Sequence, residues 1–163
     1  MDALDIQFAF FTHSASETRY LGESIGALLQ APVVLALHGD LGAGKTTLIQ
    51  GIAAGLGLRQ RVTSPTFTLV NEYPLPKDWR LFHIDSYRLD AGEAETIGLD
   101  EILDDEQAII IIEWAERVAN LLPSERVDIQ LTTEQDAQSR KIVVSASANL
   151  THFVQTLQEG MTR

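Results

Sequence analysis

HGDLGAGKTTL, which spans residues 38–48, concentrates three glycines, one lysine and two threonines in a short stretch. The apolar run before it, residues 33–37, is typical of a strand buried on both faces of a parallel sheet. After it, apolar residues recur between 48 and 56 with the period of a helix. Residues 39–46 match the phosphate-binding pattern G-x-x-x-x-G-K-[ST], which requires such a strand, loop and helix in this order. The stretch therefore predicts a P-loop that binds the phosphates of a nucleotide.

Each part of this loop has an expected role in binding ATP or ADP. The glycines let the backbone N–H groups turn toward the β-phosphate, where a side chain would collide with the ligand. The helix that follows adds the positive end of its dipole. We expect Lys45 to bridge the β- and γ-phosphates, Thr46 to place its hydroxyl on Mg²⁺ and Thr47 to add a phosphate contact. The residues expected to contact the nucleotide in this loop are Asp40, Leu41, Gly42, Ala43, Gly44, Lys45, Thr46 and Thr47.

Two further apolar runs end in carboxylates. Residues 108–112 lead to Glu113 and residues 81–84 lead to Asp85, so both acids are expected at the edge of the sheet where α/β proteins bind ligands. Each would repel a nearby triphosphate by about 4 kcal/mol, and a divalent cation removes this conflict. We expect Glu113 to hold Mg²⁺ directly or through water, and Asp85 to be a second metal or water-positioning group. Which of the two orients the attacking water stays open.

A segment rich in hydroxyl groups, TSPTF at residues 63–67, follows the predicted P-loop helix. It is similar to switch segments in which a threonine closes on the γ-phosphate and Mg²⁺. Thr66 is therefore a candidate for the catalytic group of residues, with Lys45, Asp85 and Glu113.

Aromatic and histidine side chains lie near these candidates in the sequence. Tyr87 and Trp114 flank the two acids, and we expect them to pack rather than to contact the ligand. His38 and His83 adjoin apolar strands, and we expect them to be structural.

The 163 residues, 45% of them hydrophobic, predict one domain over residues 1–163. Strand and helix patterns alternate, which indicates an α/β fold, namely a P-loop NTPase-like three-layer sandwich with a mainly parallel central sheet. Helices are expected after a capping box at Ser14 and Glu17, after the P-loop, and near residues 150–157. The expected strands are residues 4–10, 33–37, 67–73, 80–85, 108–113, 127–132 and 140–146.

Composition excludes several other classes of protein. The chain has no cysteine, hence no disulfide and no thiolate metal site. No secretory signal or membrane-spanning run is present, so we expect a soluble, cytoplasmic protein without a membrane partner. A net charge of −11 disfavours direct binding of nucleic acid, so any RNA is expected to be held by a more basic partner. No guanine-reading [NT]-K-x-D motif is present, which favours adenine as the base.

Taken together, the motifs resemble the TsaE family, formerly YjeE, of bacterial ATPases in tRNA threonylcarbamoyladenosine biosynthesis. The resemblance covers roughly residues 12–123 and is far more specific than the P-loop alone. It rests on GDLGAGKTTL at 39–48, SPTFTLV at 64–70 with Glu72 and Tyr73, H-x-D-x-Y-R-L at 83–89, and IEW at 112–114.

The resemblance implies an ATPase that acts with the proteins TsaB and TsaD to place threonylcarbamoyl on the adenosine beside the anticodon of tRNA. TsaD carries the transfer chemistry in that family, and tRNA is reached only indirectly through the complex. The resemblance also implies that the nucleotide base lies between the start of the first helix, around Thr12, and Arg140 in the last hairpin.

Trp114 occupies the position after Glu113 where many P-loop ATPases have a catalytic glutamate. We therefore expect slow hydrolysis by the isolated chain, with a partner completing the site. Two alternatives remain open. One is a small-molecule kinase in which the arginines of Arg59-Gln60-Arg61 act as lid cations, and the other is a nucleotide-gated docking module whose hydrolysis is incidental.

Overall fold

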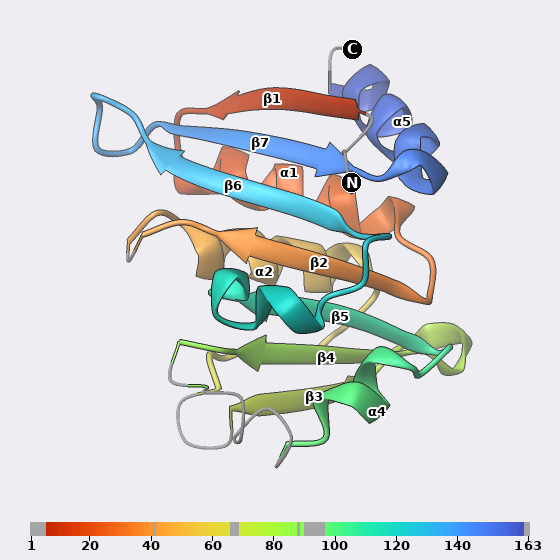
Figure 1. Cartoon of the computed structure of the whole chain (residues 1–163). Helices are drawn as coiled ribbons and strands as arrows, with labels where there is room; N and C mark the ends of the chain where they lie inside the picture. Colours follow the sequence, from red (N-terminus) through yellow and green to blue (C-terminus); the bar gives the residue numbers. More distant parts are fainter. Residues whose placement is uncertain (1–5, 41, 66–68, 88, 90–96, 162–163) are drawn as a thin grey trace.

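A seven-stranded sheet with the order β1-β7-β6-β2-β5-β4-β3 forms the centre of the molecule (Figure 1). The computed structural model describes residues 6–40, 42–65, 69–87, 89 and 97–161. The strands are β1 (Ile6–Thr12), β2 (Val33–His38), β3 (Val70–Pro74), β4 (Arg80–Asp85), β5 (Ala108–Glu113), β6 (Val127–Thr133) and β7 (Arg140–Ala146). The inner strands β6, β2, β5 and β4 are parallel, whereas β7, β1 and β3 add antiparallel pairs at the two edges.

Helices cover both faces of this sheet and make three layers (Figure 1). On one face α1 (Ala15–Leu28), α2 (Lys45–Gly55) and α5 (Thr151–Met161) bury one apolar cluster. On the other face the short α4 (Leu99–Leu103) and the 3₁₀ segment η2 (Ala115–Leu121) bury a second cluster. Two further 3₁₀ turns are η1 (Pro76–Asp78) and η3 (Ala148–Leu150). The prediction of an α/β three-layer sandwich with a mainly parallel central sheet is confirmed.

Most element boundaries agree with those expected. The capping box is present, since the Ser14 hydroxyl accepts a hydrogen bond from the Glu17 N–H at 3.1 Å. The first strand extends to Thr12, two residues beyond its predicted end. The third strand begins at Val70, and residues 67–68 of its predicted range, 67–73, lie outside the described part of the chain. No helix among the described residues is both long and apolar enough to cross a bilayer.

Glycines on α1 and α2 bring these helices unusually close together. A Cβ atom on Gly22 would lie 2.4 Å from the Leu48 carbonyl oxygen, and one on Gly51 would lie 2.2 Å from that of Arg19. Both distances are shorter than any ordinary contact, so α2 can occupy its place against α1 only with glycine at these positions. Because the P-loop continues directly into α2, this packing also determines where the loop lies.

Candidate nucleotide-binding site

A cavity of about 400 Å³ lies where the P-loop meets the carboxyl ends of β4 and β5. It is lined by Gly42, Gly44, Lys45, Thr46, Thr47, Ser64, Asp85, Glu113, Trp114 and Arg140. Asp40 and Ala43 line a neighbouring cavity of about 350 Å³. Leu41 and Thr66 lie outside the described residues. The fold thus brings most of the candidate residues from four separate parts of the sequence to one place.

The P-loop backbone requires glycine at two of these positions. Gly42 and Gly44 have φ angles of +80° and +96°, in the left-handed region that disfavours side chains. Gly44 is also the N-cap of α2, and no side chain caps the helix there. The N–H groups of the first turn therefore remain available to an anion, which the helix dipole further attracts.

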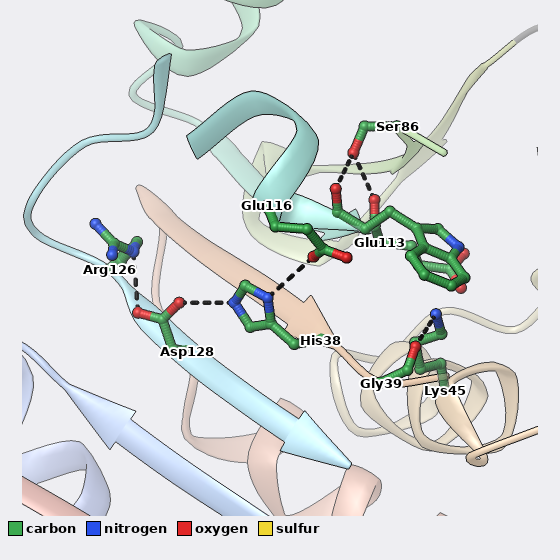
Figure 2. Close-up of polar contacts among 9 residues, drawn as sticks. His38, Gly39, Lys45, Ser86, Glu113, Glu116, Arg126 and Asp128 are labelled. Carbon is green, nitrogen blue, oxygen red and sulfur yellow. Dashed lines mark hydrogen bonds and ion pairs between the residues drawn. The ribbon is translucent and has the colours of Figure 1, made fainter. Parts of the chain in front are cut away.

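Lys45 is buried at the start of α2, with 6% of its surface exposed. Its Nζ donates to the Gly39 carbonyl oxygen at 2.6 Å, as Figure 2 shows, and lies 3.7 Å from the centre of the Trp114 ring. Burial lowers the pKa of Lys45 below its ordinary value, and the charges of nearby carboxylates, Glu113 foremost, partly oppose this shift. An anionic ligand beside the ammonium would compensate its charge further.

Asp85 and Glu113 are direct partners in the β4–β5 register, so their side chains share one face of the sheet. Glu113 is buried, and its Oε2 accepts a hydrogen bond from His83 Nε2 at 2.7 Å. Asp85 Oδ1 accepts from the Tyr87 N–H at 3.0 Å, so this carboxylate also stabilises the turn after β4. Both acids and the Thr46 hydroxyl reach the same cavity.

These oxygen donors fit Mg²⁺, which binds a few carboxylates together with phosphates and water. Among the described residues, no three His, Asp or Glu side chains could hold a metal by themselves. A site completed by the Thr46 hydroxyl and by ligand phosphates agrees with that finding, since Mg²⁺ rarely uses an all-protein cage.

Trp114 and Tyr87 pack against each other as expected, with ring centres 4.8 Å apart. Trp114 does more than pack, because its ring also forms the wall of the cavity above Lys45. Its φ and ψ of 57° and 44° are left-handed, a conformation that costs a residue with a side chain about 1–2 kcal/mol. The buried Ser86 hydroxyl lies within hydrogen-bond distance of the Glu113 and Trp114 carbonyls, which helps hold this turn (Figure 2).

Arg140 links the P-loop to β7. Its Nε donates to the Ala43 carbonyl at 2.9 Å and its Nη2 to the Gly42 carbonyl at 3.2 Å. Arg140 also lines a cavity of about 270 Å³ beside the P-loop, with Ala15, Thr18, Gly44, Thr47, Ala137 and Gln138. Thr12 is the register partner of Arg140 and is buried, and its hydroxyl lies 2.7 Å from that of Thr18. Thr18 lines this cavity, and Thr12 contacts it only through Thr18.

His38, at the end of β2, joins two elements that flank the P-loop. Its imidazole lies 3.2 Å from Glu116 Oε2 in η2 and 3.0 Å from Asp128 Oδ1 in β6, as Figure 2 shows. Asp128 in turn accepts from Arg126 at 2.9 Å. The hydrogen bond to Asp128, with help from Glu116, raises the pKa of His38 above its ordinary value. The structural role expected for His38 is therefore observed, but nothing in the sequence pattern indicated its partners.

Sequence reasoning assigned no functional contact to several residues around the site, among them His83, Ser86 and Glu116. For His83 the sequence held one indication, since the H-x-D spacing places it on the same strand face as Asp85. Ser86 and Glu116 carry no such signal, because their partners are far away in the sequence.

Several known proteins are similar to this chain over most of its length. The family model described as threonylcarbamoyl adenosine biosynthesis protein TsaE matches residues 12–142. The tRNA threonylcarbamoyladenosine biosynthesis protein TsaE of Bacillus subtilis is 39% identical over 146 residues, which is 88% of each chain. The protein of that description from Nostoc sp. is 34% identical over 159 residues, covering 94% of this chain and 95% of its own.

A solved structure extends the similarity to three dimensions. The crystal structure of Bacillus subtilis YdiB superposes with a TM-score of 0.80 at 31% identity, covering 95% of this chain and 96% of that one. The fold is that of the P-loop NTPases, with a mixed sheet whose core is mostly parallel. Because the family model spans most of the sequence and the relatives match over nearly their whole length, the chain belongs to the TsaE family of threonylcarbamoyl adenosine biosynthesis proteins.

Proposed function

We propose that this chain is a single-domain ATPase that binds and hydrolyses ATP with Mg²⁺. It would support TsaB and TsaD in the threonylcarbamoylation of the adenosine next to the anticodon in tRNA, in the cytoplasm. The observation that carries the proposal is one cavity that combines the uncapped start of α2, Lys45, Thr46 and the two carboxylates Asp85 and Glu113. These groups supply both the positive charge and the oxygen ligands that a metal-bound polyphosphate needs.

The phosphates would lie against the N–H groups of the P-loop and the first turn of α2. Lys45 would exchange its hydrogen bond with the Gly39 carbonyl for contacts to the β- and γ-phosphates, which compensate its buried charge better. Bound Mg²⁺ would neutralise charge on the phosphates, held by Thr46 and Glu113 with Asp85 beside them. One of the two carboxylates would orient the attacking water, and Thr66 would close over the γ-phosphate from the segment at residues 63–67.

For the base we propose the cavity of about 270 Å³ beside the P-loop, with adenine as the base. Arg140 lines both this cavity and the phosphate cavity, so its guanidinium can contact the nucleotide while it holds the loop. Thr12 would act from behind, through its contact with Thr18.

Hydrolysis by the isolated chain is expected to be slow. The residue after Glu113 is Trp114, whose ring lies over Lys45 and offers no carboxylate to activate water. A partner would then complete or order the site, as groups supplied in trans do in GTPases. The net charge of −11 fits a protein that meets tRNA only through such partners.

The kinase alternative has less support. Arg59 and Arg61 line a cavity of about 340 Å³ with Arg19 and Gln50, away from the residues around Lys45. In this conformation the two arginines do not form a lid over the phosphates.

The test is calorimetry of Mg²⁺–ATP binding, followed by tRNA modification reconstituted with TsaB and TsaD. Lys45→Ala should lower the affinity for ATP about 10- to 100-fold, the value of a lost hydrogen bond between charged groups. Glu113→Gln should bind ATP but neither hydrolyse it nor sustain modification. Absence of Mg²⁺-dependent binding by the natural chain contradicts the proposal, and modification sustained by a hydrolysis-deficient Glu113→Gln variant would favour the docking module.

A further inference from the structure

His83 and Glu113 form a hydrogen bond that is buried below the nucleotide cavity. His83 has 1% of its surface exposed and Glu113 has 6%, and the atoms His83 Nε2 and Glu113 Oε2 are 2.7 Å apart. We propose that His83 is a positioning residue that orients the Glu113 carboxylate toward the Mg²⁺ of the bound nucleotide. This inference rests on the function proposed above.

The strand register explains how the two side chains meet. In the parallel pair β4–β5, His83 is opposite Ile111 and Asp85 is opposite Glu113. Because alternate residues of a strand project to the same face, His83, Asp85 and Glu113 lie on one face of the sheet. His83 lies two residues before Asp85, which ends β4 and is paired with Glu113. It therefore contacts the Glu113 side chain from the interior of the protein, whereas the nucleotide cavity lies on the other side of that side chain.

The hydrogen bond leaves one carboxylate oxygen for the cavity. Since an ionised carboxylate only accepts, His83 Nε2 is the donor and Oε2 is engaged. No described residue donates to Oε1, and Glu113 also lines the nucleotide cavity. A carboxylate held by one oxygen has lost most of its rotational freedom, which is how second-shell contacts orient a metal ligand.

The second ring nitrogen of His83 is a buried polar atom whose hydrogen-bonding capacity is not satisfied by any described residue. His83 Nδ1 is buried and has no hydrogen-bond partner within the described part of the chain. A buried polar atom without a partner costs free energy of folding, and such atoms in native proteins call for an explanation. His83 is present in spite of this cost in folding free energy, and the one hydrogen bond that its described ring atoms make is the bond to Glu113. We therefore assign its role to that bond.

The test compares three substitutions that separate the donor from the bulk of the ring. Glutamine places an amide N–H close to the position of Nε2, asparagine is too short to reach it, and leucine fills similar space without a donor. The measurement is the affinity for ADP by calorimetry at several Mg²⁺ concentrations and in excess EDTA, with urea unfolding of each variant.

His83→Gln should retain the gain in ADP affinity that Mg²⁺ confers, to within about threefold. His83→Asn and His83→Leu should lose about 10-fold or more of that gain, in the range measured for second-shell contacts. Affinity in EDTA should be the same in all four proteins, because the P-loop contacts to phosphate are untouched.

The outcomes separate the inference from the proposed function. If the natural chain gains no ADP affinity from Mg²⁺, the proposed metal site itself is wrong, and the role of His83 with it. If the natural chain shows the gain and His83→Leu keeps it, only the positioning role is overturned. If the Mg²⁺ effect follows urea stability across the three variants instead of the presence of a donor, His83 is structural and the inference is also overturned.

Discussion

The ammonium of Lys45 lies 3.7 Å from the centre of the Trp114 ring and 2.6 Å from the Gly39 carbonyl oxygen. Both contacts involve the cation that a P-loop offers to phosphate. In this structure the Gly39 carbonyl and the Trp114 ring occupy the position around the ammonium that a phosphate would take. A nucleotide would have to displace these two contacts to bind Lys45.

The contact between Lys45 and Trp114 predicts a fluorescence signal for nucleotide binding. When phosphates attract the ammonium, the environment of the indole should change, and with it the emission of Trp114. The chain has two tryptophans, Trp79 and Trp114, so Trp79→Phe leaves Trp114 as the sole reporter. Titration of Trp79→Phe with Mg²⁺–ATP should change the emission, whereas the same titration of Trp114→Phe should not. An unchanged Trp79→Phe spectrum at saturating ATP would mean that the ring does not sense the phosphates.

Close packing of α1 and α2 predicts a large difference between two glycine-to-alanine substitutions. Gly51→Ala would place a Cβ 2.2 Å from the Arg19 carbonyl and should destabilise the fold by about 1–3 kcal/mol or more. Gly160→Ala is the control, since a Cβ there meets no atom within 4 Å, and in helix α5 it should stabilise by up to about 1 kcal/mol. Urea unfolding measures both values. Equal effects would show that the helices can separate without cost.

The links from His38 to Asp128 and Glu116 predict a pH dependence of stability. The folded chain raises the pKa of His38 above 6.5. The imidazole therefore binds its proton more tightly in the folded state than in the unfolded state, and protonation of His38 favours folding. This contribution is fully present below the ordinary pKa and is lost as the pH rises through the raised one. The stability advantage of the natural chain over His38→Gln should therefore be larger at about pH 6 than at about pH 8. An advantage that grows with pH would contradict the link.

Arg140 contacts two P-loop carbonyls and lines both cavities, so its removal should affect the base and the phosphates differently. If the base occupies the smaller cavity, Arg140→Ala should weaken ATP about 10-fold and inorganic tripolyphosphate by less. Competition against a fluorescent nucleotide gives both affinities. Equal losses for the two ligands would assign Arg140 to the loop alone.

The local parts of the fold could be predicted from the sequence. Buried strands such as β5 consist of consecutive apolar residues, and the α1 start carries its own cap in Ser14 and Glu17. The P-loop pattern likewise specifies its own conformation, because left-handed φ angles at Gly42 and Gly44 exclude most other residues. Such features depend on neighbours in the chain, and the sequence states those neighbours directly.

Three features could be identified only from the tertiary structure. They are the antiparallel strands at the sheet edges, the glycine contacts between α1 and α2, and the partners of the buried polar groups. Arg140 is 97 residues from Ala43, and His38 is 90 residues from Asp128, yet each pair shares a hydrogen bond. His83 and Glu113 meet only because β4 and β5 pair in one register out of many. The sequence thus determined which residue types form the site. Strand pairing and helix packing decided which oxygen or ammonium group faces which partner, because hydrogen bonds depend on distances that the order of residues in the chain does not give.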